Sequence, residues 1–226
     1  GGGLYVAGTL TAPLIGNRFE DNTAEVRGGG AFLGGVVIGT LENNDFIANT
    51  IANTATRNFA GAGICIAQGL LGDVIDNRFF RNSAEMEEFG TGLFTSSGAG
   101  MFIGGTFDGG FGGNEFAGNR ATCADGASLG GGLFVQGEVD RNFFEQNLFS
   151  RNHADFGGGL YLMFEGGRNV LLRSNVFTEN TCNELQGADI GSAQRVTLIN
   201  NTFSGTAAGE ASVFFPIIVG ENQSAL

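Results

Sequence analysis

Short apolar triplets recur along the chain, and each follows a glycine-rich entry. The first and third positions of each triplet are aliphatic or Met, whereas the second position is mostly aromatic. This alternation has a period of two residues and predicts short β-strands whose alternate side chains are buried. The complete triplets begin at Leu4, Ala31, Ile64, Met101, Leu133 and Leu160, and a degraded copy, GADI, begins at Gly187.

A second motif, NxFxxN, follows each triplet. Its Phe and closing Asn are Phe19/Asn22, Phe46/Asn49, Phe79/Asn82, Phe116/Asn119, Phe149/Asn152 and Phe177/Asn180, and a seventh copy has Phe203 followed by Thr206. Three residues before each motif lies another apolar position, occupied by Leu14, Leu41, Val74, Phe111, Phe144, Leu172 and Leu198. This position predicts a further buried strand in every repeat.

The spacing of the two motifs predicts the architecture. The glycine entry lies 16 to 18 residues before the following NxF motif in the six complete repeats, whereas the gap from the closing Asn to the next glycine entry varies from 5 to 16. A repeat whose core has a fixed length and whose length varies at one corner, here called the elastic corner, indicates a solenoid. The frequent Gly, Asn and Thr residues disfavour helices. We therefore predict an all-β, right-handed parallel β-helix of about seven coils over residues 1–206. Residues 207–226 would form a C-terminal cap or the start of a further coil.

The recurring Phe and Asn residues are interpreted as architectural, because they return in every coil. We expect the seven rings to stack in the interior. The Asn side chains should form ladders of amide hydrogen bonds between coils. Asn also tolerates the left-handed backbone conformation, so we expect the ladder residues themselves to adopt it in tight turns.

The second triplet position gives the first candidate binding surface, which we call the aromatic stripe. If the neighbouring positions point inward, this one points outward and forms an exposed, mostly aromatic interface. The alternative is that these side chains stack on one another beneath the loops. The stripe consists of Tyr5, Phe32, Cys65, Phe102, Phe134 and Tyr161.

The elastic corner gives the second candidate surface, which we call the loop patch. The longest corner segments, 50–60, 83–97 and 120–129, belong to three consecutive coils and should therefore cluster. Its charged candidates are Arg57, Glu85, Glu87, Glu88 and Asp125. Clustered Glu residues are usually solvated, and we predict no metal site.

Composition narrows the function classes. The 41 glycines lack the triplet period of collagen, and 42% hydrophobic residues with 22 Phe favour a packed core over a disordered linker. The net charge of −12 and the absence of Lys disfavour nucleic acid as a partner, and no apolar run is long enough for membrane insertion. Three cysteines without a CxxC motif indicate no zinc site, and a Cys123–Cys182 disulfide would need a loop excursion.

The candidates for catalysis are weak. Glycoside hydrolysis needs two carboxylates at a defined separation, and Asp73, Asp76 and Asp108 are the acids that would supply them. Asp73 and Asp76 occupy turn-like positions, however, and His153 has no evident partner. Because nucleotide-binding and nucleophile motifs are also absent, we predict a protein that is not an enzyme and carries no cofactor.

The repeats resemble those of the polymorphic outer membrane proteins, which alternate GGA(I/L/V) and FxxN motifs. Here GGGAFL, GAGICI, GAGMFI, GGGLFV and GGGLYL correspond to the first motif, and NRFEDN, NDFIAN, NRFFRN, NEFAGN, NLFSRN and NVFTEN to the second. The glycine motifs are GGG or GAG more often than GGA. The resemblance implies a bacterial, autotransporter-like β-helix that is displayed at the cell surface and acts in adhesion.

The function expected from these observations is that of a non-catalytic extracellular scaffold. Its partner would be a protein or glycan at a cell surface, bound by the loop patch or the aromatic stripe. The alternative is a structural subunit that binds further copies of itself in a filament or surface layer. A polysaccharide-active enzyme is the third hypothesis.

Overall fold

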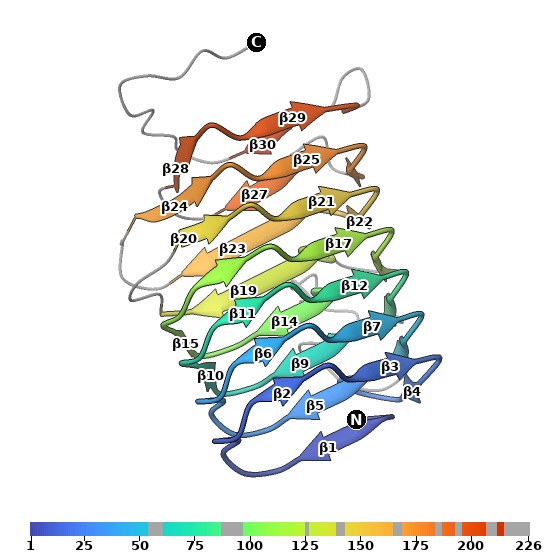
Figure 1. The fold of residues 1–226 in the computed structure, drawn as a ribbon. Helices are drawn as coiled ribbons and strands as arrows, with labels where there is room; N and C mark the ends of the chain where they lie inside the picture. The colour runs from blue at the N-terminus through green and yellow to red at the C-terminus, as the bar shows by residue number, and fades with distance from the viewer. Residues whose placement is uncertain are drawn as a thin grey trace.

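The chain winds into a solenoid of stacked coils (Figure 1). A computed structural model describes residues 1–53, 61–86, 97–124, 127–138, 143–164, 169–183, 187–192, 196–206 and 212–214. All pairings between its strands are parallel, and each strand pairs with its counterpart in the neighbouring coil. The described residues contain no α-helix that could cross a membrane.

Each complete coil passes through four sheets, which we number in chain order. The first sheet contains the triplets and has the strands β1 (Leu4–Val6), β5 (Ala31–Leu33), β9 (Ile64–Ile66), β14 (Met101–Ile103), β19 (Leu133–Gly137), β23 (Leu160–Phe164), β27 (Ile190–Ser192) and β30 (Val213–Phe214). The second sheet has β2 (Leu14–Ile15), β6 (Leu41–Glu42), β11 (Val74–Ile75), β16 (Phe111–Gly112), β20 (Phe143–Glu145), β24 (Val170–Arg173) and β28 (Val196–Ile199).

The third sheet carries the NxF motifs, and the fourth follows the closing Asn residues. The third sheet has β3 (Arg18–Glu20), β7 (Asp45–Ile47), β12 (Arg78–Phe80), β17 (Glu115–Ala117), β21 (Leu148–Ser150), β25 (Val176–Thr178) and β29 (Thr202–Ser204). The fourth has β4 (Thr23–Ala24), β8 (Thr50–Asn53), β13 (Ser83–Met86), β18 (Arg120–Cys123), β22 (His153–Ala154) and β26 (Thr181–Cys182). A short additional sheet pairs β10 (Gly69–Leu70) with β15 (Thr106–Phe107).

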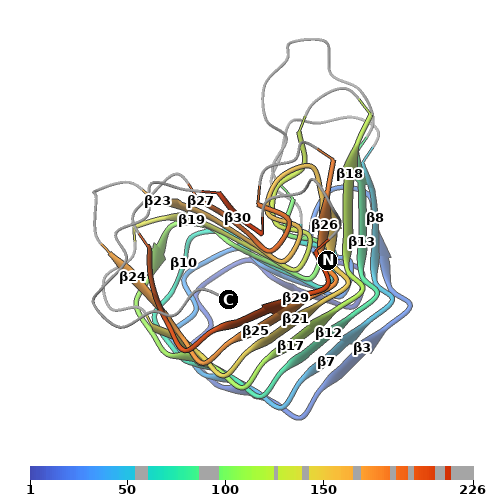
Figure 2. The same ribbon diagram turned by 90° about the horizontal axis from the view of Figure 1, so that it is seen from above.

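The core lies inside the coils, between the first and third sheets (Figure 2). The first and third triplet positions point into it, as the period of two predicts; Ile64 and Ile66, for example, are fully buried. The apolar position before each NxF motif joins the same core from the second sheet. The predicted column of seven Phe rings is present, with neighbouring centroids 4.4 to 5.1 Å apart and ring planes within 11° of parallel.

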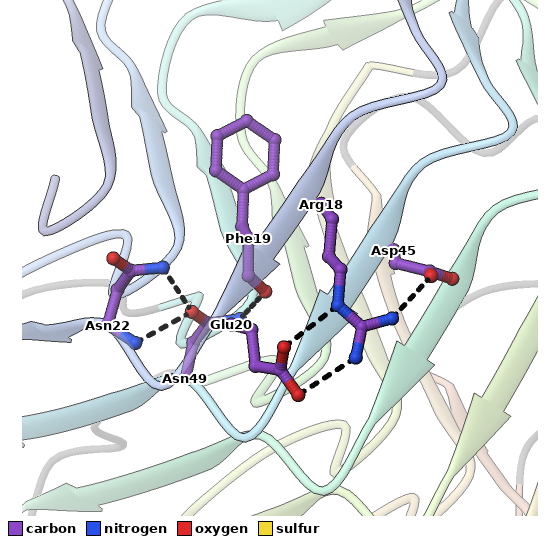
Figure 3. Close-up of polar contacts among 6 residues, drawn as sticks. All are labelled: Arg18, Phe19, Glu20, Asn22, Asp45 and Asn49. Carbon is purple, nitrogen blue, oxygen red and sulfur yellow. Dashed lines mark hydrogen bonds and ion pairs between the residues drawn. The ribbon is translucent and has the colours of Figure 1, made fainter.

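The predicted asparagine ladder is confirmed. From Asn22 to Asn152, the backbone N–H and Nδ2 of each ladder Asn donate to Oδ1 of the Asn one coil further on, as Asn22 does to Asn49 (Figure 3). Nδ2 also donates to a main-chain carbonyl of the preceding coil, so that Asn49 reaches Phe19 O at 2.9 Å. A second ladder runs in parallel from Asn17 through the first Asn of each motif.

The expectation that the ladder residues adopt left-handed backbone is wrong. The residue before each ladder Asn has the positive φ instead, as at Asp21 (φ 55°), Ala48 (φ 51°) and Arg81 (φ 54°). The left-handed residue turns the corner, so the following Asn can lie along the stacking direction and use its amide between coils. Any residue that tolerates this conformation fits the corner, which explains why its identity varies.

The third glycine of each entry is required by the close approach of the next coil and by the ladder beside it. A Cβ at Gly132 would lie 2.5 Å from Gly159 O and 3.3 Å from the Asn152 side chain. In the degraded GADI copy this position is Asp189, and the same coil has Thr206 in place of the ladder Asn. Asp189 then ends the ladder, because its carboxylate accepts from Asn180 Nδ2 at 2.8 Å and from Thr206 Oγ1 at 3.1 Å.

The C-terminal segment predicted as a cap or a further coil is described only in part. Residues 212–214 contain β30, which extends the first sheet by pairing in parallel with β27. The remainder of 207–226 lies outside the described residues.

Candidate functional site

The aromatic stripe is not a continuous exposed surface, so that prediction is wrong for its central coils. Phe102 and Phe134 are 2% and 0% exposed, and Cys65 is fully buried. They pack against Leu129 and Phe156, which come from the elastic corner and pair with each other across neighbouring coils. The alternative prediction, that these side chains stack beneath corner segments, describes the central coils correctly.

The two ends of the aromatic stripe are more accessible. Tyr5 is 63% exposed and stacks on the partly buried Phe32 at a centroid distance of 5.4 Å. A shallow hollow of about 500 Å³ lies beside this pair and is also lined by Glu25 and Arg27. At the other end Tyr161 is partly buried, and burial raises the pKa of its hydroxyl. The exposed aromatic surface is therefore small and confined to separate places.

Most of the loop patch lies outside the described residues. Arg57, Glu87, Glu88 and Asp125 belong to the undescribed segments. Glu85 is described: it is exposed on β13, and its carboxylate lies 3.5 Å from Ser83 Oγ. Because β8, β13 and β18 pair side by side, the three long corner segments do start next to one another.

The acids considered for catalysis have structural contacts. The Asp73 carboxylate accepts a hydrogen bond of 2.7 Å from the Gly110 backbone N–H. Asp76 is a left-handed corner residue (φ 53°) that precedes a ladder Asn. Among the described residues, no group of three or more His, Cys, Asp or Glu side chains could hold a metal ion.

His153 lies on the outer face of the fourth sheet and has a partner that the sequence did not indicate. Its Nδ1 lies 2.9 Å from Thr181 Oγ1, one coil further on. Partial burial lowers the pKa of His153, and the Arg120 charge lowers it further, while Asp155 partly opposes them. The Asp155 carboxylate itself accepts from the Ser128 N–H and hydroxyl and from Asn183 Nδ2, so it holds the corner together.

The cysteines are free thiols. Cys123 and Cys182 are not bridged. They lie in β18 and β26, which are separated by β22, and Cys182 aligns with Ala121 rather than with Cys123. Burial raises the pKa of Cys65 to about 12, so this thiol is protonated at neutral pH.

The outer face of the third sheet contains a hollow that the sequence analysis did not anticipate. The residue after each NxF Phe points outward, and in consecutive coils it changes from Phe80 to Ala117 and then to Ser150. The next residue turns the corner, and there Gly118 lies between Arg81 and Arg151. Ala117, Gly118 and Ser150 are small, whereas Phe80, Arg81 and Arg151 beside them are large, and this difference leaves a depression.

We call this depression the third-sheet hollow. Its volume is about 460 Å³. Ala117 and Ser150 are only 8% and 7% exposed and form its floor, while the Phe80 ring forms one wall. The lining residues are Phe80, Arg81, Glu115, Ala117, Gly118, Leu148, Ser150, Arg151 and Thr178.

Charged side chains surround the Phe80 ring. The guanidinium carbons of Arg78 and Arg81 lie 4.8 and 4.7 Å from the ring centroid. Arg78 also lies 3.7 Å from the Glu115 carboxylate. Arg151, on the far side of Gly118, contacts a carboxylate of the next coil through Nε at 3.2 Å. The hollow therefore combines an aromatic wall with a rim of opposite charges.

The remainder of the third sheet has a different surface. In the first two coils Arg18 forms ion pairs with Glu20 at 2.8 Å and with Asp45 at 3.3 Å (Figure 3). These groups are largely exposed, and Glu20 occupies the position that Ala117 and Ser150 occupy in the hollow. The sequence signal for the hollow is a change in the last four residues of the NxFxxN motif, from FFRN to FAGN to FSRN in consecutive repeats. This change can be interpreted only when the register between coils is known.

Comparison with known proteins places the chain in a family. A family model described as a right handed beta helix region matches residues 87–215, which is more than half of the chain. The chain belongs to the right-handed β-helix family. No curated protein and no solved structure gives a significant match to it. Membership of this family agrees with the predicted right-handed coil. The resemblance to polymorphic outer membrane proteins stays a prediction.

Proposed function

We propose that this β-helix is a non-catalytic, surface-displayed scaffold that binds a glycan in the third-sheet hollow. The observation that carries the proposal is the position of the Phe80 ring beside a low floor at Ala117, with Arg81, Ser150 and Glu115 around it. This hollow takes the place of the aromatic stripe as the proposed binding surface, because the central rings of the stripe are buried.

The chemistry of the hollow suits a sugar. A sugar carries apolar C–H groups as well as hydroxyls. The apolar part of the hollow is the Ala117 floor and the border of the Phe80 ring that Arg78 and Arg81 leave uncovered, and polar groups lie beside it, so the hollow matches both parts of a sugar. The volume of about 460 Å³ lies in the usual range for small-molecule sites, roughly 300 to 1,000 Å³. A typical protein interface needs about 800 Å² on each partner, for which the hollow alone is small.

The arrangement of carboxylates supports binding without turnover. Glycosidases use a pair of acids across the scissile bond. Glu115 is the single carboxylate among the described residues that line the hollow, and it lies beside Arg78. Of the acids suggested by the sequence, Asp73 directly precedes β11 of the second sheet and Asp76 forms the corner between the second and third sheets, so neither lines the hollow.

Display outside a bacterial cell is part of the proposal and is supported by the repeat motifs, which resemble those of surface-displayed passengers. The ladders and the continuous Phe column also suit a stiff stalk that presents a lateral site. Assembly with further copies of the chain stays a prediction.

The proposal is tested with glycan arrays followed by calorimetry on the best-bound oligosaccharide. Phe80→Ala removes the aromatic wall and Ala117→Trp fills the floor, so each should weaken binding at least tenfold. Ile47→Ala is the matched control, because Ile47 occupies the same outward position one coil before Phe80. Full binding by Ala117→Trp would overturn the site.

A further inference from the structure

We infer that the preferred ligand is a sugar that carries a single carboxylate, a uronate within a glycan of low charge density. This inference rests on the proposed glycan site and concerns its charge selectivity. It follows from the two guanidinium groups that flank Gly118 at one edge of the hollow.

The donors of Arg81 are available to a ligand. Its guanidinium carbon lies 4.7 Å from the Phe80 centroid, and Arg81 forms no ion pair within the described part of the chain. A guanidinium that lies over a ring keeps the N–H groups at its edge free to donate in its own plane. Arg81 is therefore held in place without using its hydrogen-bonding capacity.

Arg151 offers a second set of donors. Its contact within the described residues is made by Nε, which lies 3.2 Å from Glu179 Oε2, and its side chain is 75% exposed. The same side chain lines the hollow. Carboxylates are bound most strongly by guanidinium groups that offer paired N–H donors, so the two arginines form a site for one such group.

Gly118 keeps the space between the two arginines open. It is a left-handed corner residue (φ 65°), and a Cβ added there would lie 3.5 Å from Arg81 Cγ. Any longer side chain would occupy the position that a ligand carboxylate needs. The glycine thus serves both the backbone turn and the access to the two guanidinium groups.

The other edge of the hollow disfavours a second anionic group. Glu115 lines that edge, where it can accept hydrogen bonds from sugar hydroxyls but repels carboxylates and sulfates. The net charge of −12 also opposes the approach of a dense polyanion. Selectivity should therefore favour an isolated uronate over a polysulfated chain.

The test compares a disaccharide that contains glucuronic acid with the matched disaccharide that contains glucose, using calorimetry at fixed ionic strength. The acidic sugar should bind at least tenfold more tightly to the unmodified protein. Arg81→Gln and Arg151→Gln should each reduce this preference while leaving the affinity for the neutral sugar nearly unchanged. Arg18→Gln is the control, because Arg18 lies on the same sheet outside the hollow.

The outcomes separate this inference from the glycan site itself. Equal affinities for both sugars, with no effect of the Arg variants but loss of binding in Phe80→Ala, would overturn the charge selectivity and retain the site. Absence of binding by either sugar, together with a negative array, would overturn both. Tighter binding of heparin than of the single uronate would contradict the expected preference for low charge density.

Discussion

Substitution of one ladder residue tests how much the amide ladder contributes to stability. Asn119 is fully buried in the middle coil, and its Oδ1 accepts from the N–H and Nδ2 of Asn82 at 3.1 and 2.9 Å. Its Nδ2 donates to Phe79 O and to Asn152 Oδ1, both at 2.9 Å. Asn119→Ala therefore removes four hydrogen bonds that the side chain makes.

The energetic consequence follows from the hydrogen-bonding groups that lose a partner. The Asn82 N–H, one amide hydrogen of Asn82 and the Phe79 carbonyl lose these bonds. Asn82 Nδ2 still donates to Phe46 O at 2.9 Å, and Asn152 Oδ1 still accepts from the Asn119 N–H at 3.0 Å. Each buried unpaired group costs about 1–3 kcal/mol, and partial relaxation favours the lower part of that range. We expect Asn119→Ala to lower the free energy of unfolding by about 3–5 kcal/mol, a large part of a typical total of roughly 5–15 kcal/mol.

The assay is urea unfolding followed by circular dichroism. The control is Asn169→Ala, whose exposed amide contacts only Thr197 within the described residues and should cost under about 1 kcal/mol. Asn119→Asp retains the acceptor but places a carboxylate opposite Phe79 O and Asn152 Oδ1, so its defect should be larger at pH 7 than at pH 4. A loss below about 1 kcal/mol for Asn119→Ala would refute the view that the ladder residues are fully satisfied and essential.

Three further substitutions test other parts of the fold, each measured by chemical unfolding. Ala48→Gly should raise the free energy of unfolding by about 0.5–1 kcal/mol, because Ala48 has φ 51° and Gly adopts this conformation without a Cβ penalty. Ala52→Gly, in the extended strand β8, is the control and should lower it. Stabilisation by both substitutions would contradict the explanation from backbone conformation. Gly132→Ala should destabilise by about 3 kcal/mol, because the new Cβ would lie 2.5 Å from Gly159 O; a neutral result would refute the contact. The lowered pKa of His153 means that the folded state binds its proton less readily than the unfolded state. Relative to His153→Gln, stability should therefore fall as the pH decreases below about 6.5, and an unchanged difference would contradict the shift.

The parts of the fold that repeat were predictable from the sequence. The buried triplet positions, the Phe column and the Asn ladder each recur at a fixed offset, so periodicity alone identifies which side chains point inward. The conformation of the corners was not predictable in the same way. Asn tolerates left-handed backbone, but each ladder Asn uses its side chain between coils, and the positive φ lies at the residue before it, as at Ala48.

The accessibility of the surface depends on residues that do not repeat. Phe102 and Phe134 are covered by Leu129 and Phe156, which belong to corner segments of variable length. The third-sheet hollow arises from differences in side-chain volume between Phe80 and Ala117, which become neighbours only through the register of the coils. Neither feature has a motif, so neither could be found before the strands were paired.

The central claim, that ligand binding takes place at the third-sheet hollow, is tested most directly by NMR. Uniformly ¹⁵N-labelled protein would be titrated with the glucuronic acid disaccharide while backbone amide shifts are followed. The account predicts that the largest shifts occur at Phe80, Arg81, Gly118, Ser150 and Arg151. Shifts concentrated at Tyr5 and Phe32, or in the corner segments after β8, β13 and β18, would contradict it.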